Sequence, residues 1–232
     1  MTTHSDFWSR RASGYDARLR QDGTAYDNRI ETALSFLGKD DKVLDIGCAT
    51  GEIGLDLAPR IAHYDGCDPA DGMIEIAKKK ALERRVPTVS FRSTNAFDQA
   101  FEAGTYDAVL IFSVLHLVPD AEALLDRARE LLRPKGVLIV ETPCLGEQSA
   151  VKRLMVQLLT APIKGLSIRS LGYSEVESLV SAAGFDIAQS REMDREDKML
   201  WISAIKTKSR TRSSKHIVPK QHRRAFPELQ SG

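Results

Sequence analysis

The chain has 232 residues, of which 42% are apolar and 28% charged, as in an ordinary globular protein with one large domain. Its net charge of +1 combines two unlike parts. Residues 206–232 carry eight basic side chains and one acid, a charge of +7, which leaves −6 on residues 1–205. An acidic body is unlike a nucleic-acid-binding surface, so only the tail has the charge for one.

Cysteine usage and the N-terminus bear on the compartment. The three cysteines are sparse and have no C-x-x-C spacing, so we expect neither a disulfide framework nor a metal site. The N-terminus carries charges where a secretory signal would need an apolar stretch, and no uncharged run approaches the roughly 20 residues of a membrane helix. These features favour a cytoplasmic protein, and they leave its oligomeric state open.

Helical and strand-like patterns alternate along the chain. Residues 1–38 are expected to form a helical cap that includes a covering helix at 24–37. Further along the chain, the patterns predict strands at 42–48, 63–69, 88–94, 106–115 and 136–142, and helices at 50–60, 70–85 and 119–133. Strict alternation of strand and helix predicts a parallel sheet with helices on both faces.

The pattern changes after the fifth strand. An apolar, helix-like stretch at 151–163 is followed by a helix at 173–185, for which Ser174 is the expected N-cap. Two strands at 185–193 and 199–206 are joined by a short charged turn, so the sheet is expected to end in an antiparallel hairpin. The tail at 207–232 lacks periodicity and is expected to be disordered.

The segment VLDIGCATG at 43–51 carries the main site signal. A strand ends near Asp45, and Gly47 and Gly51 permit a tight turn into a helix at the sheet edge where ligands bind. A dinucleotide-binding loop would need glycine or alanine at position 52, where Glu52 stands and would repel a pyrophosphate. An NAD(P)-dependent oxidoreductase is therefore disfavoured.

The whole arrangement resembles the class I S-adenosylmethionine (SAM)-dependent methyltransferases. The sequence D-x-G-x-A-x-G stands where that family has D/E-x-G-x-G-x-G, and Ala49 at the middle position is tolerable if its φ stays negative. GCDPADGM at 66–73 is similar to the second landmark, and its Asp68 can accept hydrogen bonds from both ribose hydroxyls. STNAFD at 93–98 is similar to the third, with Asn95 in place of the family's acid.

The resemblance covers residues 30–206 and includes further matches at 105–120 and 131–141. It implies an α/β fold with a Rossmann-like, seven-stranded, mostly parallel sheet, an antiparallel terminal hairpin and helices on both faces. The methyltransferase domain would span 39–206, with a substrate-covering insertion at about 145–172. The implied cofactor is SAM, bound by Asp45, Gly47, Cys48, Ala49, Thr50, Gly51, Asp68, Pro69, Met73, Asn95, Ala96, Phe97 and Ser113. Phe97 has the alternative of packing on the core.

The subgroup that the chain resembles most is the small-molecule methyltransferases related to quinone-biosynthesis enzymes. FWSRRASGYDARL at 7–19 is similar to their N-terminal segment, which implies that Tyr15 lies over the SAM site as part of a lid. His116, after the fourth strand, and Glu141, at the end of the fifth, complete the candidate catalytic set, because either could accept a proton from the methyl acceptor. The alternative for His116 is a packed boundary histidine.

The expected function is methyl transfer from SAM to a small, hydrophobic organic acceptor, with O-, N- or C-methylation undetermined. Two alternatives remain open. A catalytically inactive SAM-fold binding protein is compatible with Ala49 and Asn95, and an RNA methyltransferase would use the basic tail. The stretch at 151–163 is expected to wall a hydrophobic pocket, touch a membrane surface or simply pack, and the tail is a candidate for peripheral contact with an anionic membrane.

Overall fold

The computed structural model describes residues 4–21, 23–161, 168–194 and 196–207. Seven strands form one sheet in the order β3-β2-β1-β4-β5-β7-β6. Their bounds are β1 (Lys42–Ile46), β2 (His63–Asp68), β3 (Val89–Ser93), β4 (Tyr106–Phe112), β5 (Leu132–Pro143), β6 (Phe185–Asp194) and β7 (Met199–Lys206). Strands β1 to β5 pair in parallel, whereas β7 is antiparallel to both of its neighbours. The expected fold class, with its antiparallel terminal hairpin, is confirmed.

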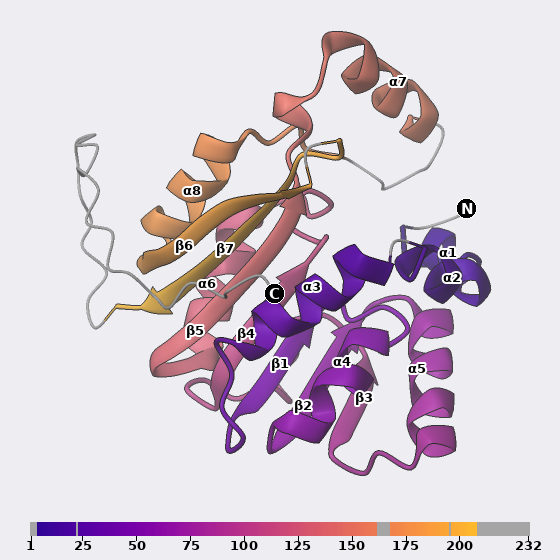
Figure 1. Ribbon diagram of the computed structural model, residues 1–232, viewed down its shortest axis with the longest axis vertical. Helices are drawn as coiled ribbons and strands as arrows, with labels where there is room; N and C mark the ends of the chain where they lie inside the picture. The colour runs from indigo at the N-terminus through magenta and orange to yellow at the C-terminus, as the bar shows by residue number, and fades with distance from the viewer. Residues whose placement is uncertain (1–3, 22, 162–167, 195, 208–232) are drawn as a thin grey trace.

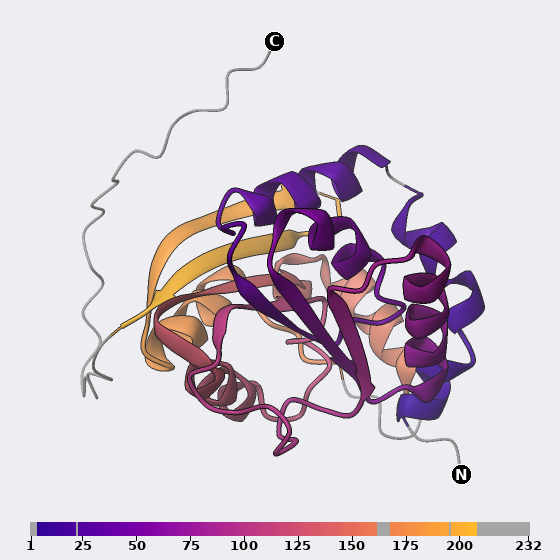
Figure 2. The ribbon, with the colours of Figure 1, turned by 90° about the horizontal axis from the view of Figure 1, so that it is seen from below.

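Helices cover both faces of this sheet, and Figure 1 shows α3 and α4 crossing in front of it. The α-helices are α1 (His4–Ser9), α2 (Tyr15–Leu19), α3 (Gly23–Leu34), α4 (Glu52–Leu57), α5 (Asp71–Arg84), α6 (Ala121–Leu131), α7 (Ala150–Thr160) and α8 (Tyr173–Ala182). Buried side chains of α3, α4 and α5 share one hydrophobic cluster, and those of α6 and α8 share another. In Figure 2, α3 and α4 lie on one side of the strands and α6 on the other.

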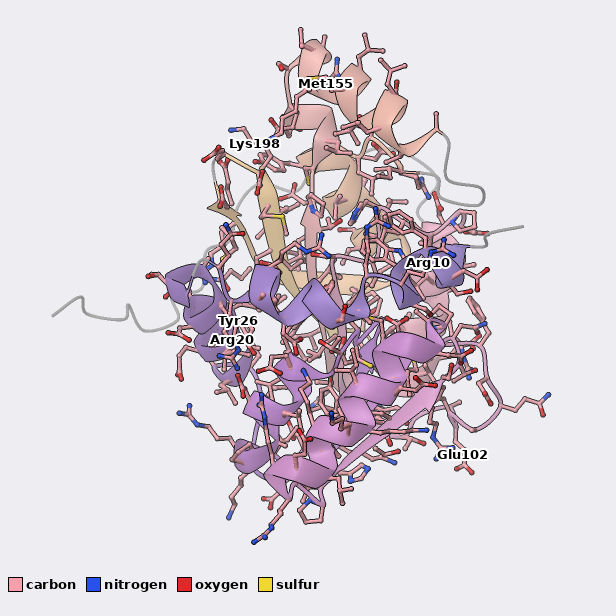
Figure 3. The ribbon with its side chains drawn as sticks, turned by 90° about the vertical axis from the view of Figure 1, so that its right-hand side faces the viewer. Arg10, Arg20, Tyr26, Glu102, Met155 and Lys198 are labelled. Atoms are coloured by element: carbon pink, nitrogen blue, oxygen red, sulfur yellow. The ribbon has the colours of Figure 1, made fainter. Side chains whose placement is uncertain are left out.

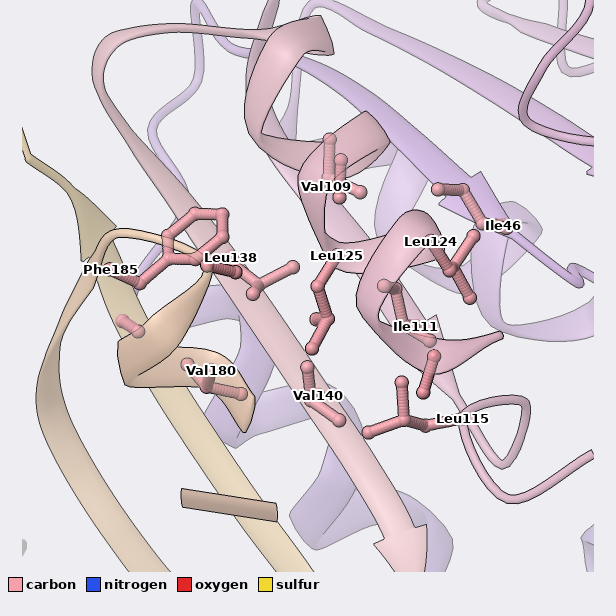
Figure 4. Close-up of a cluster of buried hydrophobic side chains, with 14 of the residues drawn as sticks. Ile46, Val109, Ile111, Leu115, Leu124, Leu125, Leu138, Val140, Val180 and Phe185 are labelled. Carbon is pink, nitrogen blue, oxygen red and sulfur yellow. The ribbon is translucent and has the colours of Figure 1, made fainter. Parts of the chain in front are cut away.

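The two clusters follow from the alternation of side chains along each strand. In β1, Val43 points into the cluster with α3 to α5 and Leu44 into the cluster with α6 and α8. Figure 4 shows the second cluster, where Leu125 of α6 and Val180 of α8 meet Val140 of β5. Both faces of the central strands are therefore buried, which explains their almost uninterrupted apolar sequences.

The strand order places a topological switch between β1 and β4. From β1 the chain adds β2 and then β3 on one side, and it then returns to add β4 and β5 on the other. The connections diverge at the carboxyl ends of β1 and β4, and in open α/β sheets the crevice at such a point is where ligands bind. The glycine-containing segment after β1 lies at this position.

Two strand boundaries differ from those expected by three residues or more. The fourth strand ends at Phe112, because Ser113 adopts a left-handed conformation with φ 56° that an extended chain cannot continue through. The fifth strand starts at Leu132, directly after α6, and the expected stop at 134–136 lies inside it as an irregularity in pairing with β4. Lys135 there has φ 67°, so the chain kinks without leaving the sheet.

The expected N-cap of α8 is wrong. Gly172, and not Ser174, is the N-cap residue, in an extended conformation. The carboxylate of Glu147 accepts the N–H of Tyr173 at 3.0 Å, and that of Glu175 approaches the N–H of Gly172 at 3.5 Å. Two carboxylates thus lie at N–H groups where this helix begins.

Helix α7 lies within the expected insertion. Its apolar side chains are exposed, namely Val151, Leu154, Met155, Leu158 and Leu159. Figure 3 shows Met155 at the opposite end of the molecule from Glu102. Residues 162–167 and the basic tail beyond Thr207 lie outside the described residues, so the expectations for them stay predictions. Across the described part of the chain, no helix combines the length and apolarity needed to span a membrane.

Candidate functional site

The turn after β1 requires glycine at two positions. Gly47 has φ 81° and Gly51 has φ 69°, both in the left-handed region. A Cβ at position 47 would lie 2.2 Å from Cγ2 of Val114, and one at position 51 would lie 2.5 Å from Cζ of Phe91. Backbone conformation and close packing therefore both exclude a side chain at these positions.

Ala49 contradicts the expectation of a negative φ. Its φ is 48°, a left-handed conformation that costs an L-residue about 1–2 kcal/mol. The conformation aims its N–H at Asp68, whose Oδ2 accepts the hydrogen bond at 3.1 Å. The turn therefore keeps its shape with alanine at the middle position, but under local strain.

Asp45 is a buried carboxylate with one oxygen unoccupied. It lies one residue before the end of β1 with 1% exposure, and its Oδ2 accepts a hydrogen bond of 2.5 Å from the hydroxyl of Tyr64. Its Oδ1 is buried and has no hydrogen-bond partner in the described ranges. Burial raises the pKa of Asp45 to about 7, an effect that the Tyr64 hydrogen bond opposes and the nearby Asp68 carboxylate reinforces. Such an oxygen is suited to a donor or cation supplied by a ligand.

Asp68, at the end of β2, joins two loops. Its Oδ2 accepts from Ala49 and its Oδ1 accepts the N–H of Ala70 at 2.8 Å. Burial raises its pKa, while these two hydrogen bonds oppose the rise. Pro69 and Ala70 lead into α5, where Met73 packs with Ala49 and Ala70 in one small cluster. The first two resemblance landmarks therefore meet in space.

The third landmark lies in the loop after β3. Asn95 Oδ1 accepts the N–H of Phe97 at 2.9 Å, so this oxygen already serves the turn of its own loop. Ala96 is buried against α6, whereas Phe97 is 55% exposed. The alternative of Phe97 packing on the core is therefore wrong, and its ring is free to meet a ligand.

A small cavity lies between the glycine turn and the N-terminal helices. Its volume is about 30 Å³, and it is lined by Tyr15, Leu19, Arg29, Asp45, Gly47, Cys48, Ala49, Thr50, Glu52, Ile53, Phe112 and Ser113. Tyr15 packs on the cluster of Ala49 and Met73. Burial is the largest influence on its phenol and raises its pKa, and the charges of Arg29, Asp68 and Asp45 also reach it. The structure thus brings Tyr15 together with both expected cofactor-binding acids.

Ion pairs hold the N-terminal segment over this turn. Asp16 of α2 accepts a short hydrogen bond from Thr50 and pairs with Lys80 at 2.8 Å. Glu52, 3% exposed, binds three cations, with N–O distances of 2.5 Å to Arg20, 2.5 Å to Lys80 and 2.6 Å to Arg84. Although burial opposes it, hydrogen bonding by these cations lowers the pKa of Glu52 to about 2. Arg20 also stacks on the ring of Tyr26, as Figure 3 indicates.

The structure separates His116 from Glu141. Glu141 and Thr142 are consecutive in β5, so their side chains leave opposite faces of the sheet. Glu141 pairs with Arg29 of α3, Oε2 to Nε at 2.5 Å, while Nδ1 of His116 lies 3.3 Å from Oγ1 of Thr142. Burial lowers the pKa of His116 to about 4, which keeps its ring neutral at pH 7. The three candidate catalytic residues therefore do not form one cluster.

Arg29 is the positively charged cavity residue that sequence reasoning missed. The expected covering helix carries an apolar stripe formed by Tyr26, Ile30 and Ala33, and Arg29 lies beside it at helical spacing. A charged residue beside a buried stripe could have indicated this role, because an arginine in the protein interior needs a partner of opposite charge. That partner, Glu141, is distant in sequence. No group of three or more potential metal ligands occurs within the ranges that the structure describes.

Part of the chain is similar to known sequences. Residues 43–136 match the family model described as a methyltransferase domain. A ubiquinone biosynthesis O-methyltransferase of Marinobacter nauticus is 33% identical over 118 residues, which are 50% of this chain and 48% of that protein. The chain spans about half the length of the curated relatives it matches.

Two solved structures share the fold. A methyltransferase in complex with the Haloferax volcanii Trm112 activator gives a TM-score of 0.72 at 16% identity, covering 89% of this chain and 99% of that chain. Geranyl diphosphate C-methyltransferase from Streptomyces coelicolor A3(2), with Mg²⁺, geranyl diphosphate and S-adenosyl-L-homocysteine, gives 0.69 at 16% identity and 82% coverage of each chain. Residues 43–136 are therefore similar to a methyltransferase domain, and the described fold is shared with solved methyltransferases, which supports a class I SAM-dependent methyltransferase related to the ubiquinone-biosynthesis O-methyltransferases.

Proposed function

We propose that the protein binds SAM at the carboxyl ends of β1 and β2 and transfers its methyl group to a small, hydrophobic organic acceptor. The observation that carries the proposal is the free, buried Oδ1 of Asp45 beside a turn where Gly47 and Gly51 cannot carry side chains. Asp45 and Asp68 are acceptors for the ammonium and hydroxyl groups of such a cofactor. The two carboxylates at the switch point therefore fit this ligand as hydrogen-bond acceptors.

The chain's own residues would bind, orient and exclude water. SAM brings an activated methyl group on a sulfonium, so the protein's task is to align the acceptor in a dry site. Of the three candidate catalytic residues, Tyr15 lines the cavity, and we propose that its side chain covers the bound cofactor. We propose His116 as the proton acceptor, because its neutral imidazole can take up a proton. Glu141 forms an ion pair with Arg29, so we propose that it affects the site by orienting that arginine.

Cofactor binding requires the N-terminal segment to move. A cavity of about 30 Å³ is far below the roughly 300–1,000 Å³ of small-molecule sites. Tyr15 and Leu19 line this cavity and also an outer groove formed with Trp8 and Arg18, so the two side chains are a shared wall. We propose that α1 and α2 act as a lid and that displacement of this wall opens the site.

Calorimetry with SAM and S-adenosylhomocysteine tests the cofactor assignment. Asp45→Asn and Asp68→Asn should each weaken binding, whereas Asp186→Asn, at an exposed position on β6, should bind as the wild type does. Undiminished binding by both site variants would sink the assignment. The acceptor is sought with labelled SAM against quinols, phenols, fatty acids and small amines. Binding without turnover across this range would favour a SAM-binding protein instead.

A further inference from the structure

We infer that Tyr64, which lies outside the cavity, is a positioning residue for cofactor binding, because its hydroxyl orients the carboxylate of Asp45. Tyr64 holds one oxygen of this carboxylate and leaves the other to the ligand. The inference rests on the proposed function and adds to it a residue from within the sheet. In this role Tyr64 does not touch the cofactor or the acceptor, so its whole effect passes through Asp45.

The contact between the two side chains is short and buried. Tyr64 lies in β2 and Asp45 in β1, and the phenol hydroxyl donates to Oδ2 at 2.5 Å. The exposure of Tyr64 is 0% and that of Asp45 is 1%, so bulk water cannot replace this hydrogen bond. Asp45 lines the cavity, and its Oδ1 has no hydrogen-bond partner among the residues that the structure describes. The two oxygens of one carboxylate therefore have separate tasks.

Tight packing fixes the ring of Tyr64 on two sides. Gly54 of α4 lies so close that a Cβ at position 54 would be 2.3 Å from Cε1 and Cζ of the ring. Phe91 of β3 meets the ring edge-on, with the two centroids 5.9 Å apart. Glycine inside a helix is unfavourable, and its presence in α4 leaves space for this phenol. The hydroxyl therefore reaches Asp45 from a fixed position.

Burial keeps the phenol in the form that donates. It raises the pKa of Tyr64 well above the ordinary value, so the hydroxyl stays protonated at neutral pH. Burial also raises the pKa of Asp45, and the hydrogen bond from Tyr64 opposes that rise. A hydrogen bond donated to the charged form of a carboxyl group favours that form. Tyr64 therefore both fixes the direction of the carboxylate and increases its ionised fraction near neutral pH.

The other titratable or charged groups around Asp45 do not provide this contact. They are Tyr15, Arg29, Cys48, Glu52, Cys67 and Asp68. Burial raises the pKa of both thiols, which keeps them neutral. Two of the charged groups are already paired, Glu52 with three cations and Arg29 with a carboxylate of β5. The charge of Asp68 favours the protonated form of Asp45, which is the opposite of the effect of Tyr64.

Calorimetric titrations with S-adenosylhomocysteine across a series of pH values test the inference. The Tyr64→Phe variant keeps the packed ring and loses the hydroxyl. The midpoint of the pH dependence of affinity should move upward by about one pH unit, which lowers the affinity at pH 7 by about fivefold or more. A merely structural role would lower the affinity at every pH and leave the midpoint in place. Such an unchanged midpoint overturns the inference.

A double variant shows whether Tyr64 acts through Asp45. The affinity of Tyr64→Phe/Asp45→Asn should equal that of Asp45→Asn within about twofold, whereas additive losses would argue for an independent role and overturn the inference. Tyr106→Phe is the matched control, because its buried hydroxyl donates to Asp65 at 3.0 Å near the amino ends of the strands. This control should keep the wild-type affinity and midpoint, and a midpoint shift equal to that of Tyr64→Phe would also overturn the inference.

A second variant keeps the test decisive if circular dichroism shows that Tyr64→Phe does not fold. Placing 3-fluorotyrosine at position 64 makes the hydroxyl a stronger donor with little change in size, so the midpoint should move downward. A midpoint that stays in place or rises overturns the inference alone, because the wild-type protein still binds the nucleoside. If the wild-type protein binds neither SAM nor S-adenosylhomocysteine, both the proposed function and the inference are overturned.

Discussion

The backbone N–H of Ala49 donates to Oδ2 of Asp68 at 3.1 Å, so the acid assigned to the cofactor's ribose also fixes the shape of the glycine turn. Loss of Asp68 therefore affects two things at once, a ligand contact and a turn conformation. This coupling explains how the chain tolerates alanine in a left-handed position, since the hydrogen bond offsets part of the strain.

Ala49→Gly should stabilise the protein. Glycine relieves a left-handed strain of about 1–2 kcal/mol in the folded state. It also raises the entropy of the unfolded chain, which destabilises the folded state by about 0.4–1 kcal/mol, so the net gain in stability should be below about 1.6 kcal/mol. Urea denaturation measures it. Ala58→Gly, at φ −51° after α4, should instead destabilise by about 0.5–1 kcal/mol. Equal destabilisation by both substitutions would contradict the strained geometry of Ala49.

Cofactor affinity should depend on pH through Asp45. Its folded-state pKa of about 7 means that the carboxylate is largely protonated below neutrality and cannot pair with a cationic ligand. SAM affinity should therefore fall as pH drops from 8 to 6, by up to about tenfold per unit below the pKa. Calorimetry across this range should give a flat profile for Asp45→Asn. An equally steep profile in that variant would assign the dependence to another group.

The raised pKa of Asp45 affects folding stability in the opposite direction to cofactor affinity, because stability should fall as pH rises. Because the unfolded carboxyl titrates near 3.8 and the folded one near 7, the stability contribution of Asp45 without ligand is complete below the lower value and is lost as pH rises through the upper one. The ligand-free Asp45→Asn variant should not lose this contribution to stability as pH rises. The measurement is the free energy of unfolding at pH 5 and pH 8 for both proteins.

His116 should make the protein sensitive to acid. Its pKa is lowered from 6.5 to about 4 by burial, so its contribution to stability is present above pH 6.5 and disappears as pH falls towards 4. The full loss amounts to about 3 kcal/mol. Urea denaturation of His116→Gln should show a shallower decline over this window. His63→Gln, at a half-exposed ring near Asp65, should keep the wild-type slope, and matching slopes in all three proteins would refute the assignment.

Weakening the Asp16 contacts should speed access to the site. Asp16→Asn removes the charge that pairs with Lys80 and loosens the contact with Thr50, while Glu52 keeps its three cations. Since the side chain of Asp16 is one-third exposed, the pair contributes below about 1 kcal/mol, and S-adenosylhomocysteine association should rise about two- to fivefold. Stopped-flow fluorescence of Trp8, which lies on the lid, can follow it. Asp27→Asn on the exposed face of α3 is the control, and identical rates in both variants would argue against a charge-held lid.

The sequence could predict the features that depend on neighbouring residues along the chain, namely the strands and the glycine turn. The seven strands follow from apolar runs between helical patterns, and the positions of Asp45, Gly47 and Gly51 follow from a strand that must turn into a helix. The relation of Arg29 to Glu141 could not be predicted in the same way, because it joins residues that are neighbours only once α3 crosses β5. The separation of His116 from Glu141 was also hidden. Ser113 breaks the strand in a left-handed conformation, and beyond it the alternation of faces no longer applies.

Both sides of the strand-order reversal between β1 and β4 come from one continuous stretch of the chain. Residues 43–136 supply β1 to β4, the glycine turn and both acids, and this is the stretch that the family model matches. The N-terminal helices and α7, which would meet the acceptor, come from outside it. Grafting the N-terminal helices and α7 region of a relative onto this stretch would be a direct route to altered acceptor choice.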